Sequence, residues 1–267
     1  MQPTWELESP RGGAQCVRTA TGLVAPPAQA AEVVSSNIVG YQKMQLTSQF
    51  TLVAAQFNNI GAETKDVQDF IGADNDLPGL DADNGYAVQT ELRYWNGTGY
   101  ETYGWDPDGD PSVPDSDHKW VDEDLAVASF DMEVGTAVWI KVPAGTTGNI
   151  VLSGEVPEGD SKEIQLRAGF NLIANPFPTA IDIQKIQPGA TIPGLDADNG
   201  FAVQTELRYW DGTGYETYGW DSEGDPSVPD SDHKWVDEDL AVASRTIELG
   251  KGFWIKTPVA GTVTISK

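Results

Sequence analysis

The feature that most constrains this chain is an internal duplication. Residues 79–129 and 194–244 align at a constant offset of 115, and only four positions differ between them. A looser match continues on both sides, and ahead of the near-identical block the offset becomes 120, as between Phe50 and Phe170. Solenoid repeats are much shorter than this period, so the sequence predicts two domains of the same fold.

Each copy has the pattern of β structure. Apolar and polar residues alternate along residues 87–95, which places Leu92 and Tyr94 on one face with Val88 and Thr90. The run breaks at residues 96–99 (NGTG) and resumes at 100–105, which predicts a hairpin with an Asn-Gly-type turn. Short strands between Gly, Pro and Asp turns favour an all-β fold with two tandem antiparallel β-sandwich modules of the jelly-roll or immunoglobulin-like kind, or small barrels.

The helical candidates are one short segment in each copy, residues 64–71 and 180–186. Glu, Pro, Gly and Asp cluster at residues 154–162, so we expect module 1 at 31–155 and module 2 at 156–267. Residues 1–30 are expected to be a leader or a disordered tail. Within them, Ala28-Gln29-Ala30 resembles a signal-peptidase site, although the hydrophobic core of a signal peptide is not evident. This favours an extracellular or cell-surface protein.

The net charge of the chain limits the kinds of partner that it can bind. With 41 acidic and 16 basic residues the formal net charge is −25, which disfavours nucleic acid and anionic membranes. No apolar run reaches the roughly 18 residues of a membrane span. Cys16 is the single cysteine and lies ahead of both modules, so they contain no disulfide. His118 and His233 are expected on surface loops.

No catalytic constellation stands out. The sequence contains no phosphate-binding loop, nucleophile elbow or metalloprotease helix. We therefore expect that the protein has no catalytic residues and is not an enzyme. A secreted hydrolase is the weaker alternative, because paired carboxylates are always present in so acidic a chain.

Acidic loops form the sharpest polar motif. Carboxylates at alternate positions around a glycine, as in DPDGD at 106–110, suit a calcium ion with six to eight oxygen ligands. A second cluster, DADNG at 81–85, resembles a shortened EF-hand start, whereas solvated turns are the ordinary alternative. The predicted calcium ligands are Asp106, Asp108, Asp110, Asp221, Glu223 and Asp225 in the first motif, and Asp81, Asp83, Asp196 and Asp198 in the second.

Tryptophans flank these loops in both copies. If exposed, such rings are platforms on which sugars stack; if buried, they fill the core. The candidate ligand-binding residues are Trp95, Trp105, Trp120, Trp210, Trp220 and Trp235, with surface glycans as the expected partner.

A strand-like segment, residues 33–42 (VVSSNIVGYQ), precedes the first copy, and its nearest counterpart is residues 149–156. The segment either completes the sheet of its own module or adds to the sheet of a neighbouring chain, which would give head-to-tail self-assembly. The candidate assembly residues are Val33, Val34, Ile38, Val39 and Tyr41.

Three motifs carry a resemblance to known proteins. GFNLIANPF at 169–177, YWDGTGYETY at 209–218 and GKGFWIK at 250–256 resemble a repeat of secreted and surface proteins of Gram-negative bacteria. The resemblance implies an exported β-sandwich with no known catalytic residues, and it implies no ligand. The first copy departs from it, with Ala55-Gln56 in place of Asn175-Pro176.

These patterns together predict an extracellular structural or adhesive protein that is stabilised by calcium and polymerises into a filament through its N-terminal strand. A carbohydrate-binding protein of lectin type is the alternative.

The calcium hypothesis has a direct test. We expect calcium to raise the thermal unfolding midpoint and a chelator to lower it, because an ion that binds only the folded state stabilises that state. Differential scanning calorimetry measures both. An unchanged midpoint would contradict the hypothesis.

Overall fold

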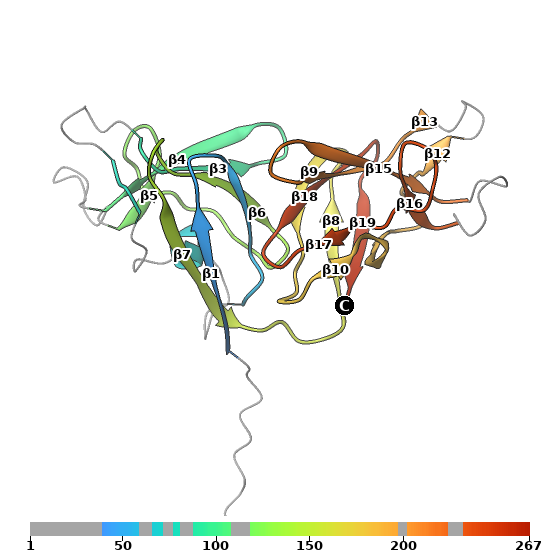
Figure 1. Cartoon of the computed structure of the whole chain (residues 1–267), viewed down its shortest axis with the longest axis horizontal. Coiled ribbons are helices and arrows are strands. Elements are labelled where there is room, and N and C mark those ends of the chain that lie inside the picture. Colours follow the sequence, from blue (N-terminus) through green and yellow to red (C-terminus); the bar gives the residue numbers. More distant parts are fainter. Residues whose placement is uncertain are drawn as a thin grey trace, which may run out of the picture. The chain divides into compact units, whose positions relative to one another are not determined.

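The fold is all-β, as predicted. A computed structural model describes residues 39–58, 66–71, 77–80, 88–107, 118–196, 202–223 and 232–267 (Figure 1). The strands of both copies belong to one compact unit, Asn37–Lys267, and they pair antiparallel in several sheets. None of the helices in these ranges is long and apolar enough to cross a membrane.

The first copy contains a five-stranded and a two-stranded sheet. The larger has the order β2-β6-β3-β4-β5, and the smaller pairs β1 with β7. The helix α1 contacts β5 and β7. The bounds are β1 (Val39–Leu46), β2 (Thr51–Ala54), α1 (Val67–Ile71), β3 (Glu91–Trp95), β4 (Tyr100–Asp106), β5 (Lys119–Val121), β6 (Ala137–Lys141) and β7 (Gly148–Glu155).

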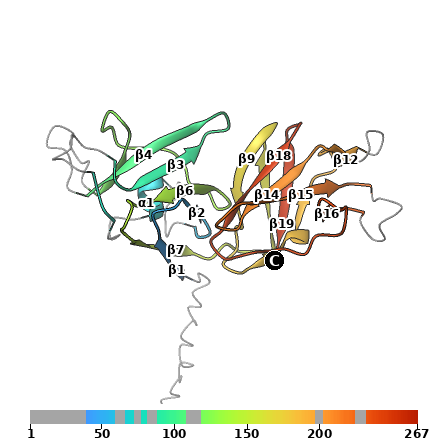
Figure 2. The same ribbon diagram turned by 45° about the horizontal axis from the view of Figure 1, so that its top comes forward.

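The second copy repeats this plan. Its five-stranded sheet has the order β16-β15-β14-β18-β9 (Figure 2). A three-stranded sheet has the order β11-β19-β8. Two short pairs, β10-β17 and β12-β13, complete it. The bounds are β8 (Ser161–Leu166), β9 (Gly169–Ala174), β10 (Ile181–Asp182), η2 (Ile183–Lys185), β11 (Ile186–Pro188), β12 (Leu195–Asp196), β13 (Ala202–Val203), β14 (Glu206–Trp210), β15 (Tyr215–Asp221), β16 (Lys234–Val236), β17 (Thr246–Ile247), β18 (Gly252–Thr257) and β19 (Gly261–Ser266).

The predicted hairpin is confirmed in both copies. In the first copy β3 and β4 pair from Glu91↔Gly104 to Trp95↔Tyr100, which leaves a four-residue loop, 96–99, that begins with Asn-Gly. Leu92 is buried as the alternation predicts, and Tyr94 packs against the same core.

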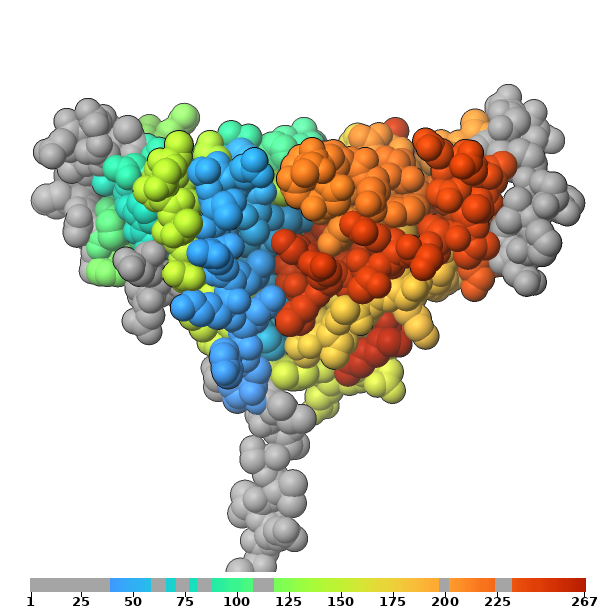
Figure 3. Space-filling view, in the orientation of Figure 1, coloured from blue at the N-terminus to red at the C-terminus, as the bar shows by residue number. Residues whose placement is uncertain are grey.

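The N-terminal strand is not an extra element. β1 pairs with β7 along its whole length, as β8 pairs with β19 in the second copy. Leu46 and Leu166 share the offset of 120 between Phe50 and Phe170, so β8 is the counterpart of β1. The predicted counterpart at 149–156 is therefore wrong, because that segment forms β7, the partner of β1. Figure 3 shows β1 (blue) beside β7 (yellow-green) on the surface.

Both predicted helical segments contain a short helical turn with the same role. Within residues 64–71 it is the α-helix α1, and within 180–186 it is the single 3-10 turn η2. Gln68 in α1 donates to the carbonyls of Trp120 and Ala128 and accepts from the Trp120 amide. Gln184 binds Trp235 and Ala243 in the same way. Each turn therefore holds the short strand that carries the tryptophan.

Each copy has its own hydrophobic core. The first includes Met44 and Leu152, and the second includes Leu166 and Ile265. The largest side chains in these cores are two pairs of tryptophans, Trp105 with Trp120 and Trp220 with Trp235, each pair with ring centroids 5.3 Å apart.

A third apolar cluster lies between the copies. In β6, Val138 and Ile140 face the first core, whereas Ala137 and Trp139 on the opposite face belong to the third cluster. In β18, Phe253 and Ile255 face the second core and Trp254 the third cluster. Both five-stranded sheets therefore have buried residues on both faces. The members of this cluster, here called the shared interface, are Leu52, Ala54, Ala137, Trp139, Leu172, Ala174 and Trp254, with Phe50, Trp95, Phe170 and Trp210 packed against them.

The shared interface pairs equivalent residues reciprocally. The Ala54 amide donates to the Gly250 carbonyl at 3.2 Å, and its equivalent, Ala174, donates to Gly135, the equivalent of Gly250, at 2.8 Å. This exchange is the pattern of a two-fold symmetric contact. At its centre, Ala137 meets its own equivalent, Gly252: a Cβ on Gly252 would lie 2.7 Å from the Ala137 Cβ.

The contact between Ala137 and Gly252 predicts the effect of a single methyl group. We expect Gly252→Ala to lower the free energy of unfolding by about 1–3 kcal/mol, because the new methyl has no space. Ala137→Gly in the same chain should restore part of the loss. Denaturant unfolding measures both.

Gly214→Ala is the matched control, because a Cβ there meets nothing within 4 Å. Equal losses for Gly252→Ala and Gly214→Ala would contradict the packing described for the shared interface.

Candidate functional site

One end of the shared interface opens into a groove of about 830 Å³ between the two copies. Its volume falls within the range of small-molecule sites, and its lining combines aromatic rings with a few polar groups, as such sites do. The first copy contributes Ser48, Gln49, Phe50, Arg93, Tyr100, Trp139 and Lys141, and the second contributes Trp210, Gly212, Thr213 and Tyr215.

The aromatic rings of the groove form a continuous series across the two copies. Phe50 meets Trp139 edge to face at 6.4 Å, Trp139 meets Trp210 at 6.4 Å, and Trp210 meets Tyr215 at 5.1 Å. Tyr100 and Tyr215 remain 43% and 47% exposed, which leaves ring surface available at the mouth of the groove. Edge-to-face contacts fix these rings in a preferred geometry before any ligand arrives.

A compact charge cluster lies at the first-copy side of the groove. Arg93 forms an ion pair with Glu91, and Lys141 Nζ lies 3.5 Å from the other oxygen of the same carboxylate. Both cations also lie over the Phe50 ring, at 4.4 and 4.9 Å from its centroid. Two cations share one carboxylate, so the groove carries hydrogen-bond donors on a chain that is otherwise strongly acidic.

Tyr100 remains a neutral hydroxyl in this setting. Burial raises the pKa of Tyr100 above its ordinary value, and the neighbouring Tyr215 raises it further, whereas a hydrogen bond with Trp139 lowers it. On the second copy, Trp254 Nε1 donates to the Tyr215 hydroxyl at 3.3 Å. Each tyrosine of the groove mouth is thus positioned by an indole.

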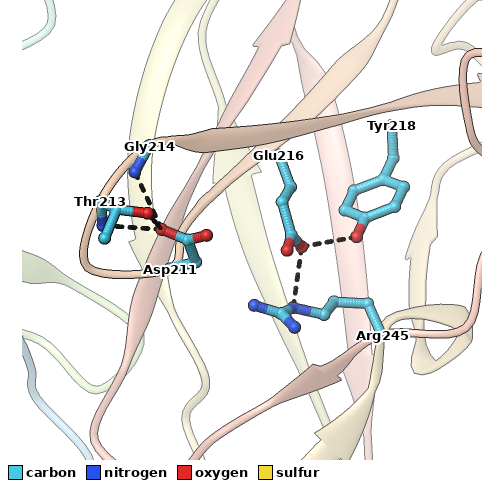
Figure 4. Close-up of polar contacts among 6 residues, drawn as sticks. All are labelled: Asp211, Thr213, Gly214, Glu216, Tyr218 and Arg245. Carbon is cyan, nitrogen blue, oxygen red and sulfur yellow. Dashed lines mark hydrogen bonds and ion pairs between the residues drawn. The ribbon is translucent and has the colours of Figure 1, made fainter.

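The turn that carries Gly212 and Thr213 is held by one carboxylate. Asp211 Oδ1 accepts from the Thr213 amide at 2.7 Å, the Thr213 hydroxyl at 2.8 Å and the Gly214 amide at 2.8 Å (Figure 4). These hydrogen bonds lower the pKa of Asp211, because they stabilise its charged form. Asn96 makes the same three contacts in the first copy.

Beside this turn, the second copy adds an arginine to a Tyr–Glu hydrogen bond that both copies have, Tyr103 with Glu101 in the first. Glu216 accepts from the Tyr218 hydroxyl at 2.8 Å and pairs with Arg245 Nε at 3.0 Å (Figure 4). Burial and the Glu216 hydrogen bond raise the pKa of Tyr218 to about 12. At the position equivalent to Arg245, the first copy has Phe130, which stacks on Tyr94 at 4.1 Å.

The structure describes only part of the predicted calcium set. Asp106 and Asp221 are buried at the ends of β4 and β15, and Glu223 donates its amide to Asp221 Oδ1 at 3.2 Å. Asp196 ends β12. The described ranges contain no group of three or more metal-ligating side chains. The remaining predicted ligands, Asp81, Asp83, Asp108, Asp110, Asp198 and Asp225, lie outside the described residues.

The prediction of an exposed, sugar-stacking ring is wrong for four of the six tryptophans. Trp105, Trp120, Trp220 and Trp235 are at most 1% exposed, so they are core residues and not a platform. Alternation along the strands and apolar neighbours explain this burial. Trp95 and Trp210 are half-buried at the shared interface, and Trp210 lines the groove. No sequence motif marks Phe50 or Trp139 as a binding residue, although both have equivalents in the second copy, Phe170 and Trp254.

The predicted assembly strand is described only in part. Val39 and Tyr41 lie in β1, opposite Glu155 and Ser153 of β7, so this part completes the sheet of its own copy. Val33, Val34 and Ile38 lie outside the described residues. His118 and His233 are exposed, as expected.

Comparisons with known proteins give no assignment. No family model, curated protein or solved structure matches this chain. The resemblance to a repeat of bacterial surface proteins therefore rests on its three motifs alone, and the function has to be argued from the groove.

The hydrogen bonds of Asp211 predict that the unchanged protein loses more stability in acid than an Asp211→Asn variant does. Because the folded state lowers the pKa of Asp211 below 3.8, its stabilising contribution is present above that pH and is lost as the pH falls through the folded-state value. Asp211→Asn, which copies Asn96, should keep the turn and remove this part of the acid destabilisation. Thermal midpoints of both proteins between pH 5 and pH 2.5 test it. Parallel pH profiles would contradict it.

Proposed function

We propose that this protein binds a glycan in the groove between its two copies. The groove carries the proposal, because it combines five aromatic side chains with hydrogen-bond donors in one open cleft. The ligand-facing residues are Phe50, Tyr100, Trp139, Trp210 and Tyr215, with Arg93, Lys141 and Thr213 at their edges.

The chemistry of a sugar fits this arrangement. A pyranose ring has an apolar face of C–H groups and an equator of hydroxyl groups, so it stacks on an aromatic ring and accepts hydrogen bonds at its rim. The half-exposed rings of Tyr100 and Tyr215 offer the stacking surface. Arg93 and Lys141 are oriented by Glu91 and therefore need little further ordering to donate.

The proposed setting follows from the sequence. Each copy is proposed to be a β-sandwich module, because each has one core between a five-stranded sheet and a smaller one. Export to the cell surface, calcium stabilisation and self-assembly through the N-terminal segment stay proposals that rest on the motifs of the sequence. A glycan-binding role agrees with a protein at the cell surface.

Substitution of the groove mouth tests the proposal. We expect the protein to bind a subset of a glycan array, and Tyr215→Ala to weaken binding to the best glycan at least about tenfold, which corresponds to about 1.4 kcal/mol. The physical reason is the loss of an exposed stacking ring. Calorimetric titration measures the affinity.

Tyr41→Ala is the matched control, because Tyr41 is also an exposed tyrosine but lies on β1 outside the groove lining. Binding that is absent from the whole array, or that is lost equally in the two variants, would contradict the proposal.

A further inference from the structure

The two ends of the shared interface carry equivalent aromatic and charged residues but are not equally open. The groove lies at the end beside Gly212. The other end lies beside Gly97, the equivalent of Gly212, where Arg167 and Phe170 line a smaller pocket of about 410 Å³. It repeats the aromatic and charged side chains of the groove, whereas Ala168 and Gly169 stand in place of Ser48 and Gln49. Arg208 and Lys256 pair with Glu206 and lie over the Phe170 ring at 5.2 and 5.5 Å, as Arg93 and Lys141 do at Phe50.

Arg167 distinguishes the two ends. Its Nη1 donates to the Asn96 carbonyl at 2.9 Å, and a Cβ on Gly97 would meet this nitrogen at 2.6 Å. At the open end, a Cβ on Gly212 would meet nothing within 4 Å. The residue equivalent to Arg167 is Thr47, whose short side chain is directed to the Gln49 carbonyl.

The rings confirm that the Arg167 end is the tighter one. Trp95 and Trp254 have centroids 5.3 Å apart, whereas their equivalents Trp210 and Trp139 are 6.4 Å apart. Trp95 Nε1 also donates to the Phe170 carbonyl across the interface at 2.9 Å. Arg167 thus draws the tip of the first hairpin onto the corner between β8 and β9, and Thr47 makes no such bond to the second hairpin.

We propose that Thr47 and Arg167 decide which end of the interface binds ligand, and that the end beside Gly97 is a second site of similar chemistry that Arg167 narrows and occupies. This inference rests on the proposed function for the nature of the ligand, a glycan. The pseudo-two-fold symmetry of the chain would allow two sites, and the difference between Thr47 and Arg167 limits it to one.

The test exchanges the two residues in the full chain and counts sites with 8-anilinonaphthalene-1-sulfonate, a probe with an apolar aromatic body and one anionic group. It suits a groove of aromatic rings and cations, and it is repelled by the acidic remainder of the surface. The expected results by fluorescence and calorimetric titration are one site in the unchanged protein, two in Arg167→Thr, and binding weakened at least tenfold in Thr47→Arg. The double exchange should keep one site.

Thr47→Ser and Arg167→Lys are the conservative controls, and both should keep one site. Melting midpoints show that each variant is folded. A single site in Arg167→Thr, unweakened binding in Thr47→Arg, or none or two sites in the unchanged protein would overturn the inference. Because the probe is not a sugar, site numbers that follow the exchange while the glycan array stays empty would reject the glycan and retain the two-residue control.

Discussion

The structure depends on the contact between the outer faces of two five-stranded sheets. A sheet in a small β domain usually buries one face and leaves the other to water. Here the second face carries Trp139 in one copy and Trp254 in the other, with alanine and glycine between them, and the two faces cover each other. Small residues at the centre allow close approach, and the aromatic rings fill the periphery. The groove is the place where this packing ends.

The duplication explains both the symmetry and the asymmetry of this contact. Equivalent residues meet reciprocally, as in Ala54 with Gly250 and Ala174 with Gly135. Two of the positions at which the copies differ lie at this contact, where identical residues would make it crowded or equally open at both ends. Ala137 faces Gly252, its own equivalent. Arg167 binds the first hairpin at Asn96, whereas its equivalent Thr47 makes no such bond to the second hairpin. Divergence between the copies has thus made two similar ends into one narrow and one open end.

The sequence was sufficient for local structure and insufficient for the site. Period-two alternation correctly places Leu92 in a core, and Asn-Gly correctly marks the hairpin loop, because both depend on neighbouring residues. The opposite face of the same strand, with Glu91, Arg93 and Trp95, has no pattern that distinguishes a solvated surface from an interface with another sheet. The groove joins Phe50 to Trp210, and only the fold brings these distant positions together.

The central claim is that the shared interface, and not the connecting segment alone, holds the two copies together. A protease site placed in residues 157–160, between β7 and β8, tests it most directly. After cleavage, sedimentation of the nicked protein at low micromolar concentration should show one particle that contains both fragments in equal amounts and retains the groove. Two separate particles, each with the mass of one fragment, would contradict the account.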